Sequence, residues 1–89
     1  MSEAEALILD RLQAHFDQQD AAAQIAVEGD GHHFQVRVVS GCFEGLRPLK
    51  RQQLIYAALG DAITSGAVHA VELQLLTPPE WDKAKVFHS

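Results

Sequence analysis

Five residues of this sequence are candidates for metal binding or proton transfer. They are His32, His33, Cys42, His69 and His88. Neutral imidazole is a common metal ligand and titrates near neutral pH, and a thiolate binds metals strongly. His32 and His33 are adjacent, and His69 lies near the start of an apolar segment. The spacing therefore raises the question of a shared site built from separate parts of the chain.

Each of these side chains also has a simpler structural role. A histidine at the start of a strand, as expected for His69, is more often hydrogen-bonded at the edge of the core than bound to a metal. His32 and His33 fall in a polar segment where solvated side chains are the norm. Cys42 follows a glycine and precedes a phenylalanine, which favours a small buried side chain over a reactive thiol. His88 is expected to be mobile near the end of the sequence.

The sequence does not predict a complete metal site or a catalytic one. It contains no C-x-x-C, H-E-x-x-H or Cys/His quartet, and no nucleophile elbow or dinucleotide fingerprint. The Gly29-Asp30-Gly31 turn is too short and too acidic to hold a phosphate. Two histidines could supply half a site, because iron–sulfur clusters accept two imidazoles on one iron. We therefore expect a protein that is not an enzyme, with any metal group completed by a partner.

One basic cluster, Arg47, Lys50 and Arg51, lies at the start of an expected helix. Positive charge there opposes the helix dipole, so the cluster is a candidate for binding an acidic partner or phosphate. The alternative is a solvated surface whose aliphatic stems cover the core.

The composition describes an ordinary globular domain. The chain has 89 residues, of which 47% are hydrophobic and 21% charged, with a formal net charge of -5. We expect one domain over residues 1–89. The negative charge argues against general attraction to nucleic acid or anionic membranes. A single cysteine excludes an internal disulfide, and no apolar run approaches the roughly 20 residues of a membrane span, so we expect a cytoplasmic protein.

Three helices are expected from apolar periodicity and capping residues. The first covers Glu3–Phe16 and begins near Ser2, followed by a polar connector from Asp17 to Asp20 and a loop through the alanines. The second covers Pro48–Thr64, with core-facing residues from Leu49 to Ile63 and a kink or division at Gly60. The third follows a capping box at Thr77–Glu80 and has Trp81 as its anchor.

Three strands complete the expected fold. Gln24–Glu28 and Phe34–Val39 alternate in polarity and predict an antiparallel hairpin, with His32 and His33 at or beside its tip. The segment from Ser65 to Leu76, sharply bounded by Gly66 and Pro78, predicts a strand central in the sheet. The order helix, strand, strand, helix, strand, helix predicts an α+β domain with a three-stranded sheet and helices on one face.

Four segments together resemble the BolA family over nearly the whole chain. They are Gly29–Val36, Phe43–Gly45 leading into Lys50–Tyr56, Val68–Val71, and Thr77–Trp81. The F-x-G, V-H-A and T-P-x-E-W elements are specific in this order and spacing. The Lys-Arg-Gln-Gln run is more similar to the IbaG branch than to the Arg-His-Arg of many BolA proteins.

The resemblance implies a fold similar to the class II KH domain and a monothiol, CGFS-type glutaredoxin as partner. The two proteins would hold a [2Fe–2S] cluster together with glutathione, for cluster trafficking or iron signalling. His69 of the V-H-A element is then one ligand. The hairpin loop supplies the other, with His33 at the matching position and His32 as an adjacent competitor, while Cys42 lies outside the loop and ranks lower. The isolated chain is expected to be monomeric and to bind no cluster tightly.

Two other functions remain open. The resemblance also implies a DNA-binding transcriptional regulator that uses Arg47, Lys50 and Arg51. The G-x-x-G loop of nucleic-acid-binding KH domains is missing, because the nearest run is Gly45-Leu46-Arg47-Pro48, and Pro48 lacks a backbone donor. The remaining alternative is a plain interaction module whose histidines only tune its response to pH.

Overall fold

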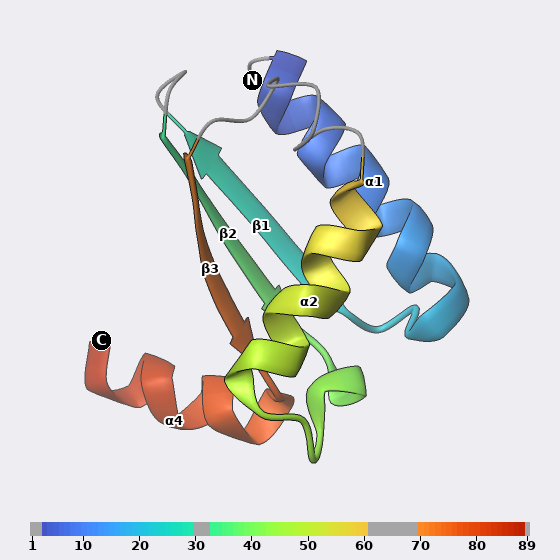
Figure 1. Cartoon of the computed structure of the whole chain (residues 1–89). Helices are drawn as coiled ribbons and strands as arrows, with labels where there is room; N and C mark the ends of the chain where they lie inside the picture. Colours follow the sequence, from blue (N-terminus) through green and yellow to red (C-terminus); the bar gives the residue numbers. More distant parts are fainter. Residues whose placement is uncertain (1–2, 30–32, 61–69, 89) are drawn as a thin grey trace.

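The computed structural model describes residues 3–29, 33–60 and 70–88 of the chain. Its elements are α1 (Glu3–Gln19), β1 (Gln24–Gly29), β2 (His33–Val39), the 3₁₀ turn η1 (Gly41–Phe43), α2 (Pro48–Leu59), β3 (Ala70–Leu76) and α4 (Pro78–His88) (Figure 1). The cap expected at Ser2, the loop residues 30–32 and the segment 61–69, with Gly66 and His69, lie outside the described residues.

The three strands form one mixed sheet in the order β1-β2-β3. β1 and β2 are antiparallel, as expected of a hairpin, whereas β2 and β3 run parallel. The central strand is β2, so the expectation that the third strand would be central is wrong. Glycine and proline mark where a strand ends but carry no information on how many neighbours it has. The alternation of half-buried Leu73 with exposed Glu72 and Gln74 is that of a strand with one face in water.

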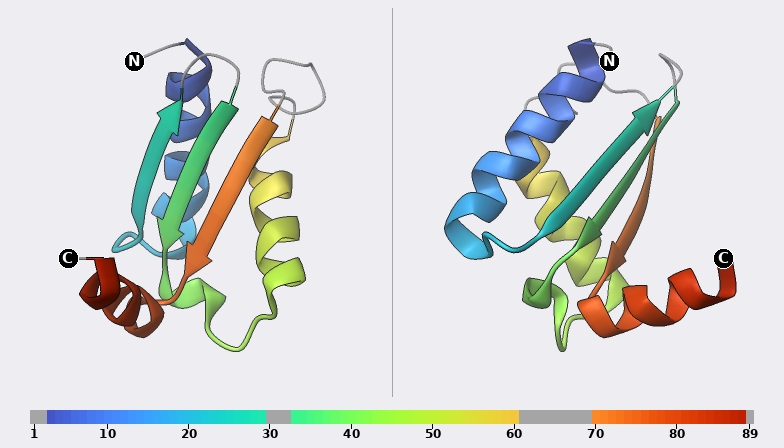
Figure 2. Two further views of the ribbon diagram at one scale, coloured as in Figure 1. Left: turned by 90° about the vertical axis from the view of Figure 1, so that its left-hand side faces the viewer. Right: turned by 180° about the vertical axis from the view of Figure 1, so that it is seen from behind.

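The hydrophobic core lies between the sheet and the pair α1 and α2, which cover the same face (Figure 2). Its buried side chains include Ile8, Leu12, Phe16, Phe34, Val36, Val38, Phe43, Ile55 and Leu59. The helix α4 follows β3 at the end of the sheet, and its Trp81 lies on the other face, where the Arg37 guanidinium is 4.3 Å from the ring centroid. The architecture confirms an α+β domain whose two longer helices share one face.

The end of the first helix differs from the expectation, whereas the expected division of the second helix at Gly60 is confirmed. α1 continues through Gln19, so Asp17–Gln19 is helical and not a connector; the buried Phe16 fixes this last turn, and its carbonyl accepts a hydrogen bond from the Asp20 N–H. α2 ends at Leu59, and Gly60, with φ of +48°, terminates the helix by donating its N–H to the Tyr56 carbonyl. The remainder of the expected second helix lies outside the described residues.

The capping box before α4 is confirmed. The Thr77 N–H donates to Glu80 Oε1 at 2.8 Å, and the Glu80 N–H donates to Thr77 Oγ1 at 3.4 Å.

Leu49 was expected to face the core, but this expectation is wrong, because its side chain is 64% exposed. It occupies the first turn of α2, which extends past the sheet. No helix in the described part of the chain is both long and apolar enough to cross a membrane.

Candidate functional site

His33 is the first residue of β2 and is exposed. Because side chains alternate along a strand, His33 faces away from the core into which Phe34 and Val36 are buried. The parallel register places His33 beside Ala70, the first residue of β3. β2 and β3 therefore begin at the same end of the sheet (Figure 1), and His69 is the residue that precedes Ala70 in the sequence.

At the loop end of the hairpin, beside His33, Gly29 and Phe34 are partners in the β1–β2 register. The Phe34 ring is buried and lies across the position that a side chain at residue 29 would occupy. A Cβ added to Gly29 would be 2.4 Å from Phe34 Cδ1, closer than van der Waals contact allows. The absence of a side chain at Gly29 therefore leaves room for the ring of Phe34, the residue that follows His33 in the sequence.

The other candidate ligands are not all brought together. His32 and His69 lie outside the described residues. Cys42 is half-buried in η1, at the far end of β2 from His33, and its thiol donates to the Gln19 carbonyl at 3.8 Å. A seven-residue strand is about 20 Å long, so Cys42 and His33 of one chain cannot bind the same metal. Within the described part of the chain, no group of three His, Cys, Asp or Glu side chains is arranged to hold a metal ion.

A further histidine, His15, received no role from the sequence. It is half-buried on α1, and its ring meets Phe16 edge-on with 5.1 Å between centroids. This contact is structural.

Of the basic cluster, Arg51 is engaged inside the fold. Its side chain is 12% exposed, and its guanidinium donates to the Leu46 carbonyl at 2.9 Å and to the Leu75 carbonyl at 3.0 Å. It also donates to both carboxylate oxygens of Glu80, at 2.7 and 3.4 Å. Arg51 thus joins α2, the end of β3 and the start of α4. No local pattern predicts these contacts, because Arg51 and its three partners are spread over 35 positions of the chain.

Arg47 and Lys50 are exposed at the start of α2. Arg47 is the N-cap residue, and its side chain makes no capping hydrogen bond. A role of these two residues in partner or nucleic-acid binding stays a prediction.

The carboxylates of Glu80 and Asp20, at the end of the sheet next to α4, have lowered pKa values. The Arg51 hydrogen bond, followed by the Thr77 N–H, lowers the pKa of Glu80 from 4.5 to about 2. The Ser40 hydroxyl, which donates to Asp20 at 2.8 Å, is the largest cause of a lowered pKa for Asp20, followed by the Ala22 N–H. Ser40 Oγ also accepts the Cys42 N–H at 3.0 Å. Both carboxylates therefore serve as fixed acceptors that tie loops to the sheet.

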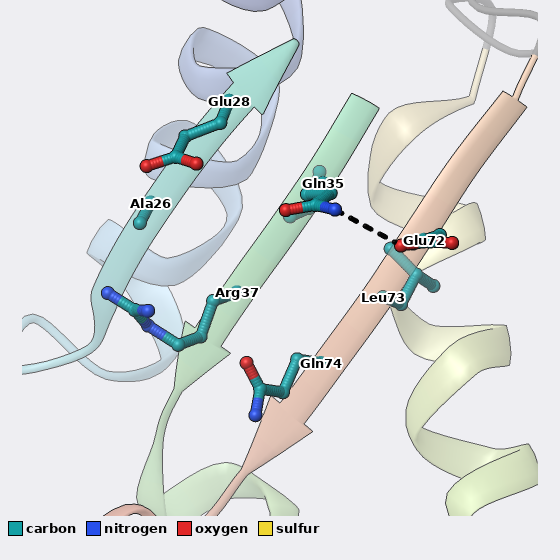
Figure 3. Close-up of a pocket in the computed structure, with 8 residues that line it drawn as sticks. Ala26, Glu28, Gln35, Arg37, Glu72, Leu73 and Gln74 are labelled. Atoms are coloured by element: carbon teal, nitrogen blue, oxygen red, sulfur yellow. Dashed lines mark hydrogen bonds between the residues drawn. The ribbon is translucent and has the colours of Figure 1, made fainter. Parts of the chain in front are cut away.

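The face of the sheet opposite α1 and α2 carries a shallow hollow of about 360 Å³ (Figure 3). Glu28, Gln35 and Glu72 form one row across the three strands, because Glu28 pairs with Gln35 and Gln35 with Glu72. The Gln35 amide donates to the Glu72 carboxylate at 3.3 Å. Arg37 and Gln74 form the next row toward α4. Sequence reasoning assigned no function to these residues, although their alternation within the strands already placed them on one face.

Comparisons with known proteins agree with this fold. The family model described as BolA-like protein matches residues 4–80. A protein of Acinetobacter guillouiae described as an uncharacterized protein in the rpoN-murA intergenic region is 48% identical over 65 residues, which cover 73% of this chain and 78% of that protein. The acid stress protein IbaG of Escherichia coli K12 is 41% identical over 58 residues, covering 65% of this chain and 69% of that protein.

The solved structures include the BolA domain of SufE1 from Arabidopsis thaliana. It superposes with a TM-score of 0.76 at 30% sequence identity, covering 90% of this chain and 98% of that domain. The family match spans both strands of the parallel pair and the capping box of α4. The chain therefore belongs to the BolA-like protein family.

Proposed function

We propose that this chain is the partner of a monothiol, CGFS-type glutaredoxin and that the two proteins jointly carry a labile [2Fe–2S] cluster for trafficking or for iron and redox signalling. His69 and His33 would be the ligands from this chain, with His32 as the alternative to His33. The observation that supports the proposal is the parallel register, which places His33 beside the residue that follows His69. Family membership supplies the partner class.

The donor set suits a shared cluster. The exposed imidazole of His33 and that of His69, the residue before β3 in the sequence, would amount to two ligands, whereas a [2Fe–2S] cluster needs four. Thiolates from the glutaredoxin and from glutathione would provide the rest. Neutral imidazole in place of thiolate raises the potential of such a cluster, and an exposed ligand leaves it accessible for transfer. The isolated chain is accordingly expected to be colourless.

The test is anaerobic co-purification with a CGFS glutaredoxin and glutathione, followed by visible absorbance and circular dichroism. The wild-type complex should show a [2Fe–2S] spectrum distinct from that of the glutaredoxin alone. His69→Ala should remove the distinct signal, and either His33→Ala or His32→Ala should do the same and so identify the loop ligand. His15→Gln, on α1, is the control and should keep it. A full signal in all three alanine variants, or a stably coloured chain without glutaredoxin, would contradict the proposal.

Duplex DNA is the weaker alternative. Of the three cations on which it rests, Arg51 already binds two carbonyls and Glu80, which leaves Arg47 and Lys50 to meet phosphates. A gel shift near physiological salt that depends on Lys50 and on Arg47 would favour this alternative, because phosphate contacts weaken steeply with salt.

The name of the E. coli relative concerns acid stress. For this chain we propose a role that persists in mild acid. The pKa of Glu80, at about 2, keeps the Arg51–Glu80 pair ionised at such pH values, and the attachment of α4 should then be retained.

A further inference from the structure

The helix-free face of the sheet differs in charge from one end to the other. The row nearer His33 contains the carboxylates of Glu28 and Glu72, and the row nearer α4 contains Arg37 (Figure 3). The Arg37 guanidinium lies over the Trp81 ring, 4.3 Å from its centroid, so its charge is directed toward α4. Among the described residues, no basic side chain forms a salt bridge with Glu28 or Glu72. The end of the face next to His33 is therefore negative.

The geometry of this row suits long cationic side chains. Neighbouring strands are about 4.8 Å apart, so the α-carbons of Glu28 and Glu72 are separated by about 10 Å across Gln35. The hollow above the row has a volume of about 360 Å³, and apolar side chains as well as Arg37 and Gln74 complete its lining. The Gln35 amide donates to the Glu72 carboxylate at 3.3 Å. A guanidinium or ammonium group entering the hollow could reach either carboxylate.

The row that lines the hollow is near the proposed ligand His33 on β2. His33 and Gln35 are two residues apart on β2, and their side chains emerge on the same face. A protein that contributes thiolates beside His33 would extend over the row that contains Gln35. We propose that the Glu28–Gln35–Glu72 row is a docking surface for a lysine- or arginine-bearing patch of the protein that completes the cluster site. The inference rests on the proposed function for the identity of that protein.

This arrangement would also orient the partner. A cationic patch is attracted to the carboxylate row and repelled by Arg37 at the α4 end, so the two possible orientations along β2 differ in energy. Because the carboxylates are exposed, their main effect is on the rate of encounter and on its salt dependence.

The first experiment measures binding of the cluster-free CGFS glutaredoxin to the full chain. The double variant Glu28→Gln/Glu72→Gln should bind about three- to tenfold more weakly at low ionic strength, chiefly through slower association, and the difference should vanish near 0.5 M salt. The matched control is Asp10→Asn/Glu44→Gln, which removes the same two charges from exposed positions elsewhere. Equal weakening in both variants, or none in the first, overturns the proposal.

A second measurement separates this inference from the proposed function. Amide shifts of the isolated chain are followed by NMR as a penta-arginine peptide is added. The largest shifts should fall on β1, β2 and β3 around Glu28, Gln35 and Glu72, and they should disappear in the double glutamine variant. Shifts spread evenly over the acidic residues of α1 overturn the docking surface. If the peptide selects the row but glutaredoxin does not bind the wild-type chain, the surface stands and its assignment to glutaredoxin fails.

Discussion

The two ends of the sheet are built in different ways. At the α4 end, Arg51, Glu80, Thr77, Asp20 and Ser40 form hydrogen bonds that join two helices, a loop and the last residues of β3. At the other end, the buried Phe34 ring packs against Gly29, and His33 is exposed. We therefore expect the first end to contribute more to stability, while His33 at the second end is exposed to solvent.

The largest effect on stability is expected from Arg51→Ala. The Leu46 and Leu75 carbonyls would lose their donor and Glu80 its cation, so the free energy of unfolding should fall by about 2–3 kcal/mol. Arg51→Lys should recover only part of this, because an ammonium group cannot reproduce the forked contacts. Denaturant unfolding gives the measurement. If Arg51→Ala is as stable as wild type, the two ends do not differ as described.

Gly29→Ala should lower the free energy of unfolding by a smaller amount, about 1–2 kcal/mol. The new Cβ would be 2.4 Å from Phe34 Cδ1, and a buried ring can move only by disturbing the core. Gly41→Ala is the matched control, because a Cβ there has no neighbour within 4 Å. Phe34→Leu should partly rescue Gly29→Ala. Equal thermal stability of the two alanine variants would show that the packing at residue 29 is unimportant.

Acid should weaken the α4 end selectively. The pKa of Glu80 is about 2 in the folded chain and near 4.5 when unfolded, so its contribution is complete above pH 4.5 and is lost as pH falls toward 2. Glu80→Gln should be less stable than wild type at pH 6. The difference in free energy of unfolding between the two proteins should become smaller at pH 4 and smaller again at pH 3. Denaturation at these pH values is the measurement; a gap independent of pH would assign the loss to packing alone.

The smallest effect on stability is expected from His33→Ala. His33 is exposed, and substitutions at exposed positions usually change the free energy of unfolding by no more than about 0.5 kcal/mol. The same variant should lose its distinct cluster spectrum if His33 is the loop ligand. A large destabilisation would instead give His33 a structural role and remove the contrast between the two ends.

Local features of the fold were predictable from sequence, whereas features that depend on tertiary pairing were not. The capping box at Thr77–Glu80 and the β1–β2 hairpin follow from residues close together in the chain. The edge position of β3 does not, because it depends on which strands pair across α2. The break in the second helix at Gly60, in contrast, follows from a local signal, the glycine itself.

The candidate site shows the same division. The candidate role of His33 and His69 came from the resemblance to a family, while the pairing of His33 with Ala70 is a register between residues 37 positions apart. The Glu28–Gln35–Glu72 row depends on the register of all three strands, and no local motif in the sequence predicts it. Arg51 was assigned to a surface cluster because its partners are distant in sequence.

The parallel pairing of β2 and β3 also has a consequence for the order of folding. Contacts between residues distant in sequence form late, because the intervening chain must first be ordered. The hairpin can form from adjacent segments, but His33 gains Ala70 as its neighbour only after α2 has folded and β3 has docked. A chain emerging from the ribosome would therefore lack the proposed ligand pair until synthesis has passed β3. Premature binding of a cluster would be disfavoured by topology alone.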